Sequence, residues 1–198
     1  MDPFHEHYLA LTAGAGFAAM GARDQIEVAG EDRIGFLNNF CTNDVKGLSP
    51  NSGVEAFILS VKGRVLGHVF IYCGEQSLVI ETSPGQADKL IEHLDRYVIT
   101  EDVQLTNVTE GWAFLFVGGV EAEERLNSLT NDQMPTEQLD FITTLGGKTS
   151  VAIGRGGAFS PCGFTMCVRE DDLSVVRDVL RDSGFIECDE GVLQAVRI

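Results

Sequence analysis

The chain has 198 residues, 44% of them hydrophobic and 22% charged, which is typical of a globular protein large enough to bury a core in one domain or in two joined ones. Its 14 Lys and Arg against 30 Asp and Glu give a formal net charge of −16, which repels a phosphate backbone and argues against nucleic-acid binding. The sequence has no apolar run of membrane-spanning length, no basic signal-peptide start and no C-x-x-C pair among its five cysteines, so we expect a cytoplasmic, reduced protein without a metal site.

The first half of the chain predicts alternating strands and helices. Apolar residues two apart predict strands, and apolar residues three or four apart predict helices. Pro84 suits the first turn of a helix. In chain order we expect a short helix within Tyr8–Met20, a strand at Gln25–Ala29, a helix from Gly30 to Cys41, a hairpin at Glu55–Tyr72, a strand at Ser77–Thr82, a helix from Ser83-Pro84 to Arg96 and a strand at Asp102–Val108.

The hairpin is the most informative of these elements. It reads E-A-F-I-L-S-V-K-G-R-V-L-G-H-V-F-I-Y, two apolar runs around a turn that contains Gly63. Successive strand residues point to opposite faces, so His68, Phe70 and Tyr72 share one face. Two interpretations stay open: an ordinary histidine that is hydrogen-bonded to its neighbours, or the wall of a pocket for a planar ligand.

The second half of the chain repeats the pattern of the first. V-A-G-E-D-R-I-G-F-L-N from Val28 resembles V-G-G-V-E-A-E-E-R-L-N from Val117, and Phe164–Val168 corresponds to Leu78–Thr82. The spacing predicts a duplicated β-α-β-β-α-β unit, which gives an α+β fold of two ferredoxin-like (split βαβ) repeats packed together. We expect the repeats at residues 25–110 and 111–198, with residues 1–24 as a lead-in that packs on the second. A ligand site is expected where the repeats meet.

Four segments of the chain carry a family resemblance. They are V-A-G-E-D-R-I-G-F-L-N-N-F-C-T-N-D at 28–44, K-G-R-V-L-G-H-V-F-I-Y at 62–72, L-D-R-Y-V-I-T-E-D-V at 94–103, and the final L-Q-A-V-R-I. Together they resemble the folate-binding aminomethyltransferase family, which includes the glycine-cleavage T-protein and the YgfZ-type folate-binding proteins linked to iron–sulfur enzyme maintenance. The G-R form of the hairpin turn is more similar to the YgfZ branch. Family members continue beyond the position of Ile198 into a barrel-like domain, so this chain is either a fragment or a shortened relative, with the family's fold but without the C-terminal barrel.

The resemblance implies tetrahydrofolate or a derivative as the cofactor, bound near the centre of the molecule. Tyr72 corresponds to a family tyrosine near the folate, and Arg197 corresponds to the arginine of an L-R-[IL]-E motif. The catalytic aspartate of the T-protein hairpin, G-G-x-x-D-D-L, corresponds to His68, which is therefore the candidate catalytic residue. The ligand-binding residues that we expect are Phe57, His68, Phe70, Tyr72, Ile80, Thr82, Arg155 and Arg197.

Two departures from the family argue against its full activity. A carboxylate only accepts hydrogen bonds, whereas a neutral imidazole donates and accepts, so His68 is a poor substitute for the aspartate. The family segment R-T-G-Y-T-G-x-x-G-[FY]-E appears here as R-G-G-A-F-S-P-C-G-F-T at 155–165. Its tyrosine becomes Ala158, and the glutamate that holds the pterin becomes Thr165.

These features favour one function and leave two alternatives open. We expect a tetrahydrofolate-binding protein without full aminomethyltransferase activity, linked to iron–sulfur enzyme maintenance. Its partners would be the small-molecule folate and a lipoyl-carrier or iron–sulfur protein, with neither nucleic acid nor membrane involved. The first alternative is an active aminomethyltransferase that uses His68 in the aspartate's role to move a one-carbon unit to tetrahydrofolate. The second is a ligand-free interaction domain.

Overall fold

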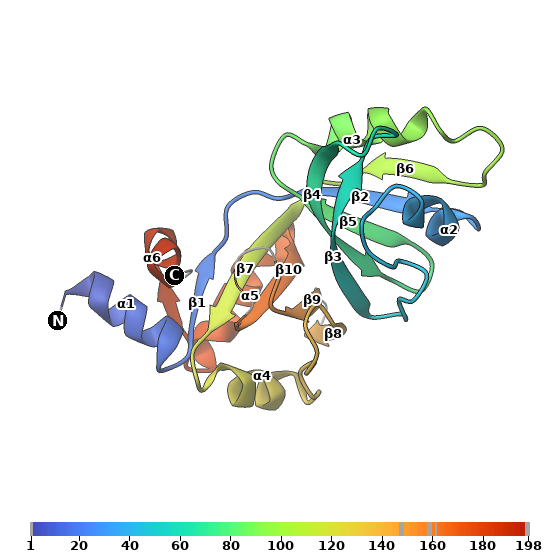
Figure 1. Cartoon of the computed structure of the whole chain (residues 1–198). Coiled ribbons are helices and arrows are strands. Elements are labelled where there is room, and N and C mark those ends of the chain that lie inside the picture. Colours follow the sequence, from blue (N-terminus) through green and yellow to red (C-terminus); the bar gives the residue numbers. More distant parts are fainter. Residues whose placement is uncertain (1, 147–148, 158–159, 161, 197–198) are drawn as a thin grey trace. The chain divides into compact units, whose positions relative to one another are not determined.

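The protein is a mixed α+β chain built from two compact units (Figure 1). The structure, a computed structural model, describes residues 2–146, 149–157, 160 and 162–196. Residues 22–110 form one unit, and residues 1–21 together with 111–198 form the other. Within the described residues, no helix has the length and apolar character needed to cross a membrane.

The unit of residues 22–110 is a five-stranded antiparallel sheet in the order β3-β4-β5-β2-β6. Four of these strands, β4-β5-β2-β6, have the ferredoxin-like order, and β3 adds a strand at the edge. The elements are β2 (Asp24–Ala29), α2 (Arg33–Asn38), β3 (Ser52–Leu59), β4 (Val65–Cys73), β5 (Leu78–Thr82), α3 (Ala87–Asp95) and β6 (Gln104–Asn107).

One face of this sheet forms the core of the unit. Ile26, Val69 and Ile71 point to this face, are fully buried and cluster with Leu37 of α2 and Leu94 of α3. Because side chains alternate along a strand, the intervening residues of β3, β4 and β5 lie on the opposite face. The core therefore fixes which side chains the opposite face presents.

Helix α3 begins later than the sequence predicted. We expected its start at Ser83-Pro84, but the helix begins at Ala87. The carboxylate of Asp24 accepts hydrogen bonds from the backbone N–H groups of Gln86 and Ala87, each at 2.8 Å. A buried carboxylate from a distant strand thus caps this helix and complements its dipole.

The second unit is a six-stranded sheet in the order β11-β1-β7-β10-β9-β8. Strand β1, which follows α1 near the start of the chain, lies between β7, its antiparallel neighbour, and β11, its parallel neighbour. We did not expect β1, β8, β9 or α6 from the sequence. The elements are α1 (Pro3–Thr12), β1 (Gly16–Ala19), β7 (Trp112–Gly118), α4 (Ala122–Thr130), β8 (Phe141–Gly146), β9 (Thr149–Arg155), β10 (Phe164–Arg169), a 3₁₀ turn (Glu170–Asp172), α5 (Leu173–Asp182), β11 (Ile186–Cys188) and α6 (Glu190–Val196).

Each unit has a turn in which a glycine stands between a strand and the helix that follows it. This turn joins β2 to α2 in one unit and β7 to α4 in the other. Gly30 has φ +104° and Gly119 has φ +105°. A Cβ atom at Gly30 would lie 2.1 Å from the carbonyl oxygen of Asp102, and one at Gly119 would lie 2.2 Å from the carbonyl oxygen of Gly14. Both positions require glycine because the left-handed backbone and the close carbonyl each exclude a side chain.

We predict that Gly30→Ala destabilises the protein more than Gly85→Ala does. Gly85 also has a positive φ, +75°, but a Cβ atom there would meet no other atom within 4 Å. Gly85→Ala should cost about 1 kcal/mol, and Gly30→Ala should cost at least about 2 kcal/mol because the clash adds to the backbone strain. Urea unfolding of the two variants measures the difference. Equal losses would contradict the steric argument.

Candidate functional site

The β3–β4 hairpin positions the candidate site. Its turn is closed by hydrogen bonds from Gly63 N–H to the Ser60 carbonyl, 2.8 Å, and from Ser60 N–H to the Arg64 carbonyl, 2.9 Å. Gly63 adopts φ +73°, which suits a hairpin turn that ends in a left-handed residue. The resulting register places Phe57 opposite His68.

Three aromatic rings follow one another on the face opposite the core. The ring centroids of Phe57 and His68 lie 5.1 Å apart, and those of His68 and Phe70 also lie 5.1 Å apart. Phe57 is 41% exposed, whereas Phe70 is 6% exposed. Tyr72 lies on the same side of β4 by alternation. We call these four residues the aromatic face.

His68 is held by a carboxylate on the neighbouring strand. Its Nε2 lies 2.6 Å from Oε1 of Glu55, and the two side chains are 42% and 57% exposed. A carboxylate only accepts hydrogen bonds, so Nε2 carries the hydrogen, which leaves Nδ1 as the acceptor of a neutral ring. The histidine is thus bonded to a neighbour, but it lies at the surface of the sheet and not in the core.

A second carboxylate lies on the same side of the sheet. Glu81 of β5 is opposite Phe70, is only 3% exposed and accepts a hydrogen bond from Nε of Arg23 at 2.9 Å. Burial raises the pKa of Glu81, and the positive charge of Arg23 opposes that rise. We did not expect this pair from the sequence, although a glutamate inside the apolar strand S-L-V-I-E-T is a visible signal.

Ile80 and Thr82 are not brought together with His68. Both are buried on the core side of the sheet, where Ile80 packs with Ile26 and Ile71. Thr82 touches the candidate site only through the backbone, because its hydroxyl donates to the His68 carbonyl at 2.8 Å. Alternation along β5 separates these side chains from the aromatic face.

The remaining expected residues belong to the other unit. Arg155 ends β9, donates to Oε2 of Glu123 at 2.6 Å and lies over the ring of Phe164, with its guanidinium carbon 4.7 Å from the centroid. Thr165, in the position of the family's glutamate, donates its hydroxyl to the Gly156 carbonyl at 2.7 Å. Arg197 and Ala158 lie outside the described residues.

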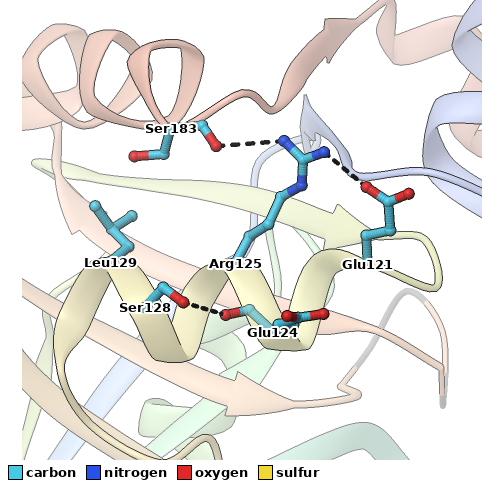
Figure 2. A pocket seen from close by; sticks show the side chains of 6 residues that line it. All are labelled: Glu121, Glu124, Arg125, Ser128, Leu129 and Ser183. Atoms are coloured by element: carbon cyan, nitrogen blue, oxygen red, sulfur yellow. Dashed lines mark hydrogen bonds and ion pairs between the residues drawn. The ribbon is translucent and has the colours of Figure 1, made fainter.

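A polar hollow of 680 Å³ lies between α4 and the end of α5 (Figure 2). Figure 2 shows Arg125 between Glu121 and Ser183. One of its guanidinium nitrogens lies 2.6 Å from Oε2 of Glu121, and the other lies 3.4 Å from the Ser183 carbonyl oxygen. The same arginine donates to the Gly184 carbonyl at 2.7 Å. Arg125 thus joins the two helices through both of its terminal guanidinium nitrogens.

Comparison with known proteins gives a consistent family. Residues 2–184 match the family described as the GCVT N-terminal domain. Aminomethyltransferases of Bacillus velezensis and Bacillus subtilis are each 28% identical to the chain, over 204 and 200 residues. Each alignment covers 97% of this chain and 54% of the relative, so the chain spans about half the length of the curated relatives it matches.

Solved structures with the same fold extend this finding. The glycine cleavage system aminomethyltransferase T from Bartonella henselae superposes with a TM-score of 0.78 at 16% identity, covering 98% of this chain and 53% of that chain. A chain of heterotetrameric sarcosine oxidase from Corynebacterium sp. U-96 superposes with a TM-score of 0.57 at 16% identity, covering 90% and 89%. These similarities establish the shared α+β fold.

We predict that Glu81 makes stability depend on pH. Its folded-state pKa is raised above the ordinary 4.5, so the folded protein keeps this proton at pH values where the unfolded chain has lost it. The contribution is therefore fully present below 4.5 and is lost as the pH rises through the raised pKa. The free energy of unfolding of the wild type should fall, relative to that of Glu81→Gln, over this window.

Urea unfolding at a series of pH values from about 4 to about 8 measures this difference. Glu92→Gln, which changes an exposed carboxylate of α3, is the matched control for a lost negative charge. A difference between wild type and Glu81→Gln that stays constant across the window would contradict the prediction.

Proposed function

The chain belongs to the GCVT N-terminal domain family, and from this membership we propose that it binds tetrahydrofolate or a derivative on the aromatic face and lacks full aminomethyltransferase activity. One observation carries the proposal. His68 stands where the family resemblance places a catalytic carboxylate, and it is held at 2.6 Å from Glu55 between the rings of Phe57 and Phe70.

The aromatic face fits a planar ring. Aromatic side chains stack on flat ligands at about 4.5–7 Å between centroids, and the exposed ring of Phe57 and the imidazole of His68 offer such surfaces. Nδ1 of His68 and the carboxylate of Glu55 supply hydrogen-bond acceptors beside the rings. Tetrahydrofolate, when bound, supplies the nitrogen atoms that accept a one-carbon unit.

The exchange of aspartate for histidine explains the loss of activity that we propose. Nε2 of His68 is engaged with Glu55, so the ring keeps one free acceptor nitrogen and no negative charge. The negative charge lies instead on Glu55, on the adjacent strand. The imidazole therefore cannot balance a positive charge at the family position as a carboxylate does there.

Folate binding should also be weaker than in relatives that have the pterin-binding glutamate. Thr165 replaces this carboxylate, and its hydroxyl donates a hydrogen bond to the Gly156 carbonyl. Loss of a hydrogen bond to a charged group costs about 1.5–3 kcal/mol. A protein that holds its ligand by stacking and by fewer polar contacts suits a role in folate binding better than one in rapid turnover.

We further propose that the folate-bound protein acts in the cytoplasm in iron–sulfur enzyme maintenance, with an iron–sulfur protein or a lipoyl carrier as its partner. The Lys62-Gly63-Arg64 turn, which is more similar to the YgfZ branch than to the T-protein branch, supports this assignment.

The His68–Glu55 contact also favours a second candidate function. A carboxylate that accepts from one imidazole nitrogen orients the ring and leaves the other nitrogen as a hydrogen-bond acceptor, as in many general bases. The chain would then be an active aminomethyltransferase that uses His68 in the aspartate's role.

We predict that the full-length protein binds 5-formyl-tetrahydrofolate at submillimolar concentration in isothermal titration calorimetry. Phe57→Ala should weaken binding about five- to tenfold, because a stacked aromatic contact contributes roughly 1–1.5 kcal/mol. Phe4→Ala, which truncates an exposed phenylalanine of α1 in the other unit, is the control and should leave the affinity unchanged. Absence of any binding heat would favour a ligand-free interaction domain.

We predict that ammonia release from an aminomethyl-lipoyl carrier and tetrahydrofolate is slow, and that His68→Asp accelerates it. The gain should reach about 100-fold if the carboxylate restores proton transfer, since such catalysis contributes roughly 10²–10⁴-fold. His68→Ala should then change the slow rate little. Rapid release by the wild type that His68→Ala abolishes would support the second candidate instead.

A further inference from the structure

The unit with the six-stranded sheet has a cavity of its own, lined by strands of that sheet and by helices α4 and α5. Its volume is about 260 Å³. Val151, Ile153 and Met166 line it from strands β9 and β10, and all three are buried. Leu129 of α4 and Leu180 of α5 line it from the helices, and Leu129 also borders the polar hollow in Figure 2. Most of the cavity wall is therefore apolar.

Two buried threonines interrupt this apolar wall. Thr144 of β8 is 8% exposed, Thr149 of β9 is 5% exposed, and both line the cavity. Within the described part of the chain, neither hydroxyl forms a hydrogen bond. Buried hydroxyls are usually paired, because a hydroxyl that has lost its water and gained no partner destabilises the folded state. Two such groups on one cavity indicate that their partner is a molecule bound in it.

The register of β8 with β9 brings the two hydroxyls close together. Thr144 is opposite Val151 in this antiparallel pair, and Thr149 lies two residues from Val151 on the same face. Diagonal neighbours of this kind have Cβ atoms about 7 Å apart. One small polar group placed between the two threonines is within reach of both.

The chemistry of the lining selects the kind of molecule. None of the described residues that line the cavity is charged, so an ion bound there would lose its hydration without gaining an opposite charge. A threonine hydroxyl both donates and accepts, and the complementary group is another hydroxyl. The cavity is larger than the apolar cavities of about 150 Å³ that accept benzene, so it has room for a ring or a short branched chain as well.

The cavity is open to solvent along α5. Val175 and Val179 of this helix line it and are themselves partly exposed, so a small molecule can enter between them and the sheet.

We propose that this cavity is a binding site for a small uncharged alcohol. Its hydroxyl lies between Thr144 and Thr149, and its apolar body packs against Met166 and the helices. The aromatic face belongs to the other unit, so this site is separate from the proposed folate site and does not depend on it.

The test uses benzyl alcohol and toluene, which share a ring and differ in the hydroxyl. NMR titration of the methyl-labelled whole chain measures both affinities and locates the site. The methyl signals of Met166 and Val179 should shift, and those of Ile26 and Val69, in the core of the other unit, should not. The wild type should bind benzyl alcohol at least as tightly as toluene, although water solvates the alcohol better. Benzoate, the charged analogue, should bind at least about tenfold more weakly than the alcohol.

A matched pair of variants isolates the hydroxyls. Thr144→Val/Thr149→Val removes both and nearly keeps the side-chain shape, so it should weaken benzyl alcohol binding about fivefold and leave toluene binding unchanged. Thr143→Val/Ser150→Ala removes two exposed hydroxyls from the opposite face of the same strands and should preserve both affinities.

Thermal unfolding without ligand gives an independent readout. Thr144→Val/Thr149→Val should raise the Tm by about 2 °C or more, because a methyl group replaces each unpaired buried hydroxyl. A lower Tm, or a variant that does not fold, would show that the hydroxyls already have partners in the protein.

Two results of the titration would also overturn the proposal. An alcohol-to-toluene affinity ratio that is the same in wild type and Thr144→Val/Thr149→Val would show an apolar void that accepts any small ring. Unchanged methyl signals with every probe would show that the cavity binds none of them.

Discussion

The register of strand β4 is the constraint on which both the core and the candidate site depend. Val69 and Ile71 are fully buried on one side, and His68 and Phe70 lie on the other. A slip by one residue would exchange the two sets, placing an imidazole in the core and aliphatic side chains on the site face. The burial of two apolar residues thus fixes the orientation of the residues that face a ligand.

Polar contacts between residues far apart in the sequence then hold the side chains that the register orients. Glu55 reaches His68 across the hairpin, and Arg23 neutralises part of the buried charge of Glu81. Asp24, next in sequence to Arg23, caps α3 on the other side of the sheet. One short segment at the start of β2 therefore supports both the helix layer and the carboxylate beside the aromatic face.

The sequence was sufficient to predict much of this architecture because its strongest signals are local. Alternation identified the face shared by His68 and Phe70, and the glycine-containing turn identified the hairpin. The repeat spacing identified the α+β class, which the structure and its relatives confirm. Ile80 and Thr82 were expected beside the ligand, but the pairing of β5 with β4 places them toward the helices. Alternation within β5 puts Ile80 and Thr82 on one face, but only the pairing of β5 with β4 shows that this face is the core face.

Strand β1 has a consequence for the order in which the chain folds. It pairs with β11, so a strand at residues 16–19 needs residues 186–188 to complete its side of the sheet. Residues 22–110 form one continuous stretch that contains all five strands of their sheet and the core packed on it. Strand β1 is synthesised before that stretch, but both of its strand partners, β7 and β11, are synthesised after it, so the inserted unit is the first of the two whose strands are all present.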